Sequence, residues 1–185
     1  MRKRLGSLAH IPESEMKEIL MLKDRLTTLE SQDKCRDSFM EYVRYIWDGF
    51  IEGEHHRLIA DKLTEVAQGK CKRLIVNMPP RHTKSEFASV YFPSWIMGLK
   101  PDMKIMQTTH TADLSIRFGR KVRNLMDTQE YKRMFDNVSL AADSKSAGRW
   151  ETSQGGEYFA AGVGGAITGR GADLLIIDDP HSEQD

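Results

Sequence analysis

Residues 74–86 read Leu-Ile-Val-Asn-Met-Pro-Pro-Arg-His-Thr-Lys-Ser-Glu. An apolar run, a tight loop and a helix that opens on Lys84-Ser85 are the elements of a phosphate-binding P-loop. Backbone N–H groups at such a helix start point at one spot, and the helix dipole favours an anion there. A lysine adds charge for the β- and γ-phosphates, and the following hydroxyl can hold Mg²⁺. We expect a strand over 71–78, a loop over 79–84 and a helix from Ser85.

The loop departs from the usual pattern, G-x-x-x-x-G-K-[ST]. Aligned on Lys84-Ser85, the chain has Met78 and Thr83 where the two glycines belong. An ordinary proline-rich turn before an amphipathic helix therefore stays open as the alternative for this loop taken alone.

A second motif stands near the other end of the chain. Residues 173–180 read Asp-Leu-Leu-Ile-Ile-Asp-Asp-Pro, four apolar residues that end in two carboxylates. This pattern predicts a buried parallel strand that delivers acids at its carboxyl end, where the ligands of α/β proteins bind. A surface strand end can also carry two aspartates, but the pairing of this motif with the loop favours a nucleotide site. One acid would coordinate Mg²⁺ and the other would lie beside it.

Length and composition restrict the remaining choices. The 185 residues are enough for one domain with a sizeable core, and 39% hydrophobic and 29% charged residues are ordinary for a soluble protein. The 27 basic and 27 acidic residues balance, so a nucleic-acid site would have to be a local basic patch. Cys35 and Cys71 have neither metal-ligand nor disulfide-framework spacing, which favours a reducing compartment. No run approaches the ~18 apolar residues of a membrane span, and no apolar segment of a secretory signal follows the basic start.

The N-terminal part, 1–35, is predicted to be a helical arm, and 36–185 the domain proper. Apolar residues recur at helical spacing in the arm, which favours a surface helix without chemistry: Met16, Ile19, Leu20, Leu22, Leu26 and Leu29. Two helices are expected over 36–68, the second opened by His55-His56. No other ligand stands at metal-binding spacing, so we expect one of the two histidines to cap the helix or to pack near the nucleotide.

The chain between the two motifs alternates helices and strands. A break is expected at Pro93, a strand over 103–109 and a helix over 111–136. A hairpin is expected from 150–152 and 157–161, followed by a glycine-rich segment that serves either as a linker or for close approach to a ligand. A basic cluster in the long helix is either a solvated face or a surface for DNA: Arg117, Arg120, Lys121 and Arg123.

Three stretches together, over roughly residues 40–185, resemble the ATPase domain of tailed-phage terminase large subunits. They are 78–86, 174–180, and the segment 164–173 that reads Gly-Gly-Ala-Ile-Thr-Gly-Arg-Gly-Ala-Asp. The loop of that family often reads Pro-Pro-Arg-His-Gly-Lys-Ser, and here Thr83 replaces its glycine. The segment 108–131 is also similar to the part that follows the family's second strand. The resemblance implies an α/β fold of the P-loop NTPase class (ASCE/RecA-like), a parallel sheet with helices on both faces.

The resemblance also implies site residues. The nucleotide-binding loop would comprise Pro79, Pro80, Arg81, His82, Thr83, Lys84 and Ser85. Lys84 would bind the β/γ-phosphates of ATP, Ser85 the Mg²⁺, and Asp178 the Mg²⁺ through water. Asp179 would polarise the attacking water, although many terminases have Glu there. Arg81 would contact phosphate, and Arg170 would reach the ATP of a neighbouring subunit as an arginine finger.

As a motor of this family, the protein would couple Mg-ATP hydrolysis to translocation of double-stranded viral DNA into a procapsid. Its partners would be DNA, the portal protein, the small terminase subunit and further copies in a ring, expected to be a pentamer. It would work in the host-cell cytoplasm, with no membrane. A helicase-like P-loop ATPase and a truncated, non-catalytic nucleotide- or DNA-binding fragment stay open as alternatives.

Two elements of the family are not found in the sequence. One is the nuclease domain, and the other is the strand that lies between the loop strand and the acidic strand. We therefore expect a fragment whose sheet is incomplete and whose stability alone is marginal, because the two flanking strands lose hydrogen-bond partners.

Overall fold

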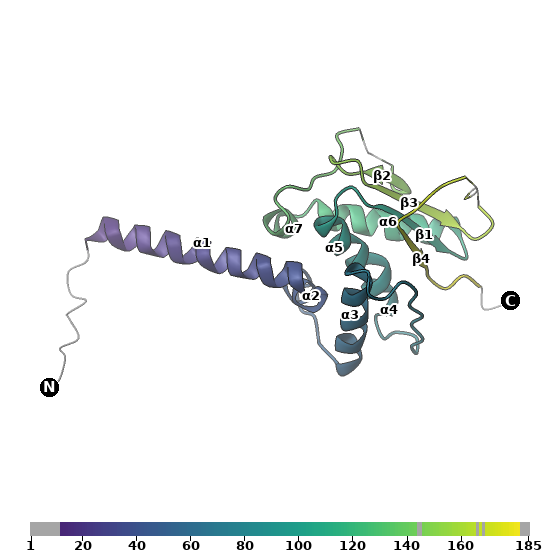
Figure 1. Cartoon of the computed structure of the whole chain (residues 1–185), viewed down its shortest axis with the longest axis horizontal. Helices are drawn as coiled ribbons and strands as arrows, with labels where there is room; N and C mark the ends of the chain where they lie inside the picture. Colours follow the sequence, from purple (N-terminus) through teal and green to yellow (C-terminus); the bar gives the residue numbers. More distant parts are fainter. Residues whose placement is uncertain (1–11, 144–145, 166, 168, 182–185) are drawn as a thin grey trace.

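The computed structural model describes residues 12–143, 146–165, 167 and 169–181. It is an α/β structure in which helices flank a mixed four-stranded sheet (Figure 1). Its elements in chain order are α1 (Glu13–Asp37), α2 (Phe39–Ile46), α3 (Glu54–Ala67), α4 (Lys84–Glu86), the π-helix η1 (Phe87–Tyr91), α5 (Phe92–Leu99), β1 (Lys104–Thr109), α6 (Ala112–Met126), α7 (Gln129–Met134), β2 (Arg149–Glu151), β3 (Glu157–Gly162) and β4 (Leu174–Ile177).

The strands lie in the order β2-β3-β1-β4. β1 pairs in parallel with β3 and with β4, whereas β2 and β3 form an antiparallel hairpin. The predictions of a strand over 103–109, of a hairpin over 150–161 and of a parallel strand before Asp178 are confirmed. That last strand, β4, is not buried as predicted, because it lies at the edge of the sheet and leaves Leu175 and Ile177 exposed. β1 is buried after its first residue, as expected for a strand with a neighbour on each side.

The prediction of a strand over 71–78 is wrong. Within the part of the chain that the structure describes, this segment belongs to no strand and to no sheet. A groove of about 900 Å³ is lined by Leu74, Ile75 and Val76 of this segment and also by β4. Strand pairing needs a neighbour at about 4.8 Å, and β4 lines the same groove instead of pairing with the segment.

The helix predicted from Ser85 begins one residue earlier and changes its hydrogen-bond register at η1. Pro93 has no N–H to bond within a helix, and α5 starts just before it. The helical run therefore continues through Pro93, and in place of the break expected there only the hydrogen-bond register changes, over η1. The single helix expected over 111–136 is instead two helices, because Thr128 caps α7 by accepting a hydrogen bond from the N–H of Tyr131.

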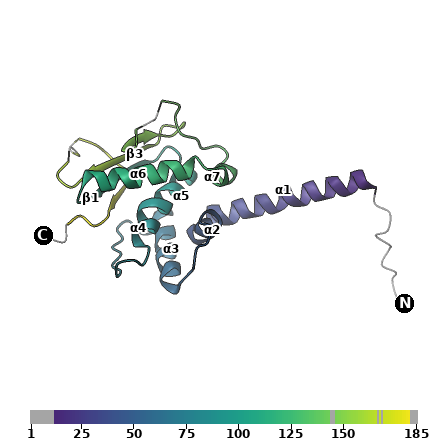
Figure 2. The ribbon, with the colours of Figure 1, turned by 180° about the vertical axis from the view of Figure 1, so that it is seen from behind.

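The core lies between α2, α3, the helical run 84–99 and the sheet. Phe39 packs edge-on against Phe87 and Phe92, and its ring centroid lies 5.4 Å from that of Trp95. Trp95 Nε1 donates to the carbonyl of Cys35, which fixes the end of α1 to this core. The rest of α1 extends away from the molecule, as both side views show (Figures 1 and 2). None of the described helices has the length and apolarity that a membrane crossing requires.

Candidate functional site

The loop and the two aspartates, far apart in the sequence, meet at one place. Lys84 Nζ lies 2.6 Å from Asp179 Oδ1 and 3.7 Å from Asp178 Oδ1. The hydrogen bond that Lys84 donates to Asp179, ahead of the charges of Asp179 and Asp178, raises the pKa of Lys84. The ammonium therefore stays protonated between two carboxylates. The two motifs that the sequence singled out form one charged cluster.

The fold brings the two aspartates there because β4 ends at Ile177 beside the carboxyl end of β1. The N–H of Asp178 donates to the carbonyl of Thr108, and the N–H of His110 donates to the carbonyl of Asp179. Asp178 is buried, whereas the side chain of Asp179 is 61% exposed. The cluster thus combines one fixed carboxylate with one accessible carboxylate.

Ser89 is a member of the cluster that the sequence analysis missed. Its hydroxyl donates to Asp178 Oδ2 at 2.8 Å, and the whole residue is buried. It stands four residues after Ser85, a spacing that places two side chains on the same side of a helix. That spacing was the one signal in the sequence that could have identified it.

The loop backbone has the left-handed conformation at two residues that are not glycine. Arg81 has φ 65° and Thr83 has φ 63°. The usual pattern places a glycine at position 83, and the structure gives the reason, because a left-handed φ is strained for a β-branched residue. The loop therefore keeps the turn without the glycine. The first N–H groups of a helix have no intrahelical partner, so those of the turn that begins at Lys84 are available to an anion.

A hydrogen-bond chain that starts at His56 supports the strained Thr83. The N–H of Gly53 donates to His56 Nδ1, so the proton is on Nε2, which donates to Thr83 Oγ1 at 2.7 Å. Thr83 Oγ1 in turn donates to the carbonyl of His82 at 2.6 Å. Burial, followed by the charge of His55, lowers the pKa of His56 and keeps the ring neutral. The expectation that one histidine of the pair caps a helix is confirmed, and His56 also holds the loop.

Two ion pairs of Glu52 fix the turn before α3. Glu52 accepts hydrogen bonds from Arg44, at 2.7 and 2.8 Å, and from Arg57. These bonds, that of Arg44 first, lower the pKa of Glu52 to about 2. The turn that carries Gly53 is thereby tied to both α2 and α3, which positions His56 against the loop.

The oxygen atoms of the cluster suit Mg²⁺, a hard cation that binds one or two carboxylates plus substrate phosphates. The residues present fit this: Asp178 and Asp179 already neutralise one cation, the Lys84 ammonium. Ser85, partly buried in the first helical turn, offers a hydroxyl. Among the described residues, no group of three or more His, Cys, Asp or Glu side chains could hold a metal by itself. A Mg²⁺ here would therefore depend on ligands from a phosphate.

The carboxyl end of β1 provides two threonines next to the cluster. Thr109 Oγ1 bonds to Ser115 Oγ at 2.9 Å and to the carbonyl of Thr111, so it holds the start of α6. Thr108 Oγ1 is buried and, within the described residues, has no hydrogen-bond partner. The Thr108 hydroxyl is therefore available to bind another group at this end of β1.

Of the two arginines that were predicted to contact ATP, Arg170 lies away from this cluster. Arg170 stacks over the ring of Phe159 at 4.0 Å and lies 3.3 Å from Glu157, the first residue of β3. It therefore sits at the end of the sheet opposite to Asp178. Arg81 is exposed in the loop. Ala166 and Thr168 of the glycine-rich motif lie outside the described residues.

The basic cluster of α6 is partly engaged within the chain. Lys121 pairs with Glu86, and Arg123 donates to the carbonyl of Ser146 at 3.2 Å. Arg117 and Arg120 are exposed.

Comparison of the chain with protein-family models, with curated proteins and with solved structures finds no match.

Proposed function

We propose that this chain is a P-loop ATPase domain, the motor domain of a phage terminase large subunit, which couples Mg-ATP hydrolysis to the translocation of double-stranded viral DNA into a procapsid. One observation carries the proposal. Lys84, at the start of a helical run, meets Asp178 and Asp179 at the carboxyl end of a strand. This is the combination of groups that ATP hydrolysis requires, since a lysine neutralises phosphate and acids hold Mg²⁺ and a water.

Each residue has a role in this proposal. The backbone of 79–83 and the ammonium of Lys84 bind the phosphates, with Arg81 at the outer side. The Ser85 hydroxyl, and Asp178 through water, would hold Mg²⁺, which would supply charge neutralisation at the β- and γ-phosphates. The accessible Asp179 accepts a proton from the attacking water. Because Lys84 is paired with Asp179 in the free chain, phosphate binding draws the lysine away and frees that carboxylate.

The proposed motor function requires binding partners. DNA, the portal protein, the small terminase subunit and further copies of the chain in a pentameric ring are the proposed partners, in the cytoplasm of the host cell. Arg170 is assigned to the ATP of a neighbouring copy, and its distance from the cluster of its own chain is compatible with such a role. The exposed Arg117 and Arg120 are the proposed contacts with DNA phosphates, so DNA binding should weaken steeply with salt.

A second candidate function is that of a nucleotide-binding fragment without turnover. The open groove beside β4 supports it, because a strand that orients the water and the acids is normally flanked by neighbours on both edges. Binding and hydrolysis therefore have to be measured separately.

The test is Mg²⁺-dependent ATP hydrolysis by the purified chain, together with binding of a fluorescent ATP analogue. Lys84→Ala should abolish binding and turnover. Lys72→Ala, which removes an exposed lysine from the segment 71–78 before the loop, should change neither binding nor turnover. Asp179→Asn should retain binding and lower turnover by about 10²-fold or more, the contribution typical of general base catalysis. Binding without turnover in the unmodified chain would favour the second candidate, and no binding at all would contradict both.

A further inference from the structure

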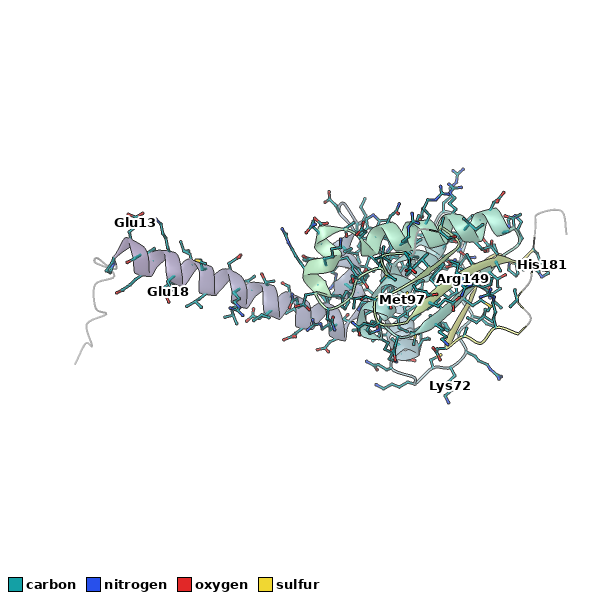
Figure 3. The ribbon with its side chains drawn as sticks, turned by 90° about the horizontal axis from the view of Figure 1, so that it is seen from above. Glu13, Glu18, Lys72, Met97, Arg149 and His181 are labelled. Atoms are coloured by element: carbon teal, nitrogen blue, oxygen red, sulfur yellow. The ribbon has the colours of Figure 1, made fainter. Side chains whose placement is uncertain are left out.

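The helix α1 exposes an unusual amount of apolar surface. It projects from the rest of the molecule, and Glu13 and Glu18 mark its distant half in Figure 3. The large apolar side chains exposed on it are Met16, Ile19, Leu20, Met21, Leu22, Leu26 and Leu29. A helix in water takes most of its stability from packing of its apolar side, and contiguous exposed apolar surface marks an interaction site. The free half of α1 therefore needs a partner.

Four of these residues form a regular seam. Ile19, Leu22, Leu26 and Leu29 follow one another at spacings of three, four and three residues. These are positions a, d, a and d of two consecutive heptads. A β-branched residue at a with leucine at d, as in the first heptad, is the combination that favours two parallel strands. The period of this seam thus indicates a coiled coil with one other helix.

The charges beside the seam fit a second copy of the same helix. Glu18 and Arg25 occupy the g positions, and Lys23 and Glu30 occupy the e positions. In a parallel dimer in register, each g residue faces the e residue five positions later on the partner. Glu18 then faces the partner's Lys23, and Arg25 faces the partner's Glu30, so both kinds of contact join opposite charges. No ion pair within the described part of the chain uses these four side chains.

The seam ends where α1 docks on its own domain. The next a and d positions would be Asp33 and Arg36, both charged. Arg36 lies 3.9 Å from Asp136, and Gln32 donates to the carbonyl of Arg133. We propose that residues 16–30 of α1 form a parallel, in-register coiled coil with α1 of a second copy of this chain. This proposal goes beyond the ATPase function and does not depend on it. Because the seam has only two heptads, the dimer is weak and depends on concentration.

The experiment is sedimentation equilibrium of the whole chain over a wide range of concentrations. The unmodified chain should convert reversibly from monomer to dimer. Leu22→Asp and Leu26→Asp should weaken the dimer at least about tenfold each. Met21→Asp, the same change beside the seam on an even more exposed residue, should leave the dissociation constant unchanged. Far-UV circular dichroism confirms that each variant keeps its fold, since all three side chains are exposed.

Charge exchange and cross-linking test the parallel arrangement. Glu18→Lys or Lys23→Glu alone should weaken the dimer, and the double variant should restore it. Oxidation should link two copies through Leu22→Cys, which faces its own counterpart in the parallel seam, and not through Met21→Cys. A chain that stays monomeric at every concentration would overturn the proposal. An equal loss of dimer affinity in Met21→Asp and Leu22→Asp would also overturn it, and so would efficient cross-linking through Met21→Cys.

Discussion

Ser89 Oγ donates a hydrogen bond of 2.8 Å to Asp178 Oδ2, and both residues are buried. The bond joins the helical run after the loop to the end of β4. In Ser89→Ala the buried carboxylate loses a donor, so we expect the free energy of unfolding to fall by about 1–3 kcal/mol. Urea unfolding followed by circular dichroism measures this change.

The matched control for this prediction is Ser153→Ala, which removes an exposed hydroxyl and should change stability by less than about 0.5 kcal/mol. A double-mutant cycle with Asp178→Asn separates the pair from its surroundings. If the losses of unfolding free energy in the two single variants simply add up in the double variant, Ser89 and Asp178 are not coupled, and the proposed link between helix and strand fails.

Thr83 combines an unfavourable backbone with a useful hydroxyl. Its φ of 63° is strained for a β-branched residue, whereas its Oγ1 bonds to His56 at 2.7 Å. Thr83→Gly removes the strain, about 1–2 kcal/mol, and loses a hydrogen bond of about 0.5–1.5 kcal/mol. We therefore expect its stability to lie within about 1 kcal/mol of that of the unmodified chain. The same unfolding assay measures it.

Thr83→Val is the decisive comparison, because valine keeps the β-branch and loses the hydroxyl. It should be destabilised by about 0.5–1.5 kcal/mol, because it leaves His56 Nε2 without an acceptor, as the glycine variant does, but keeps the strain that the glycine variant removes. A valine variant as stable as the glycine variant would mean that the left-handed backbone is not strained here.

His56 should make the stability of the chain depend on pH. Its pKa is lowered from 6.5 in the folded state, first by burial and then by the charge of His55. Between the folded pKa and 6.5 the unfolded chain binds more protons, so the free energy of unfolding falls as the pH falls through this window. Above pH 6.5 this contribution is fully present. Stability curves measured in urea at several pH values between 5 and 8 test this.

The variant His56→Gln keeps a donor for Thr83 and removes the titrating ring, so its curve should be flatter below pH 6.5. His110→Gln, which replaces an exposed histidine outside this hydrogen-bond chain, should keep the slope of the unmodified chain. An unchanged slope in His56→Gln would show that His56 is not the group responsible.

Local patterns were sufficient to predict most elements of the fold. An unbroken apolar run that ends in two carboxylates predicted β4, and short segments bounded by turn, glycine or charged residues predicted β1 and the hairpin. The meeting of Lys84 with two aspartates was also predicted, from the pairing of the two motifs, although only the aspartates follow a strand; the strand expected before the loop does not form. Pro93 predicted a break, but the helical run accommodates its missing N–H by the change of register at η1 just before it.

The sequence could not give the features that depend on neighbours. Residues 71–78 have the composition of a strand, yet pairing needs a partner that lies beside them, and β4 does not. Ser89 and the contact of His56 with Thr83 arise from packing between helices. Arg170 stands in a glycine-rich motif, but its position over Phe159 follows from the path of the chain. Tertiary contacts decide these points, and a single sequence does not display them.

The outer edge of β4 should make this chain marginal in isolation. β4 pairs with β1 on one side, and its other side lines the groove. Leu175 and Ile177 are 55% and 57% exposed. We expect a low unfolding midpoint and association between open edges. A cooperative unfolding transition at high temperature would contradict this, as would failure of Leu175→Lys to reduce association more than Leu58→Lys, the same change on another exposed leucine.

Hydrogen exchange tests the same edge residue by residue. The N–H of Asp178 donates to β1, and N–H groups alternate in direction along a strand. The N–H of Ile176 should therefore point to β1 and those of Leu175 and Ile177 into the groove. We expect the amides of Leu175 and Ile177 to exchange much faster than that of Ile176, because only the latter is held in the ladder. Equal protection of all three amides would show that a further segment already pairs with β4, and the sheet would then be closed on this side.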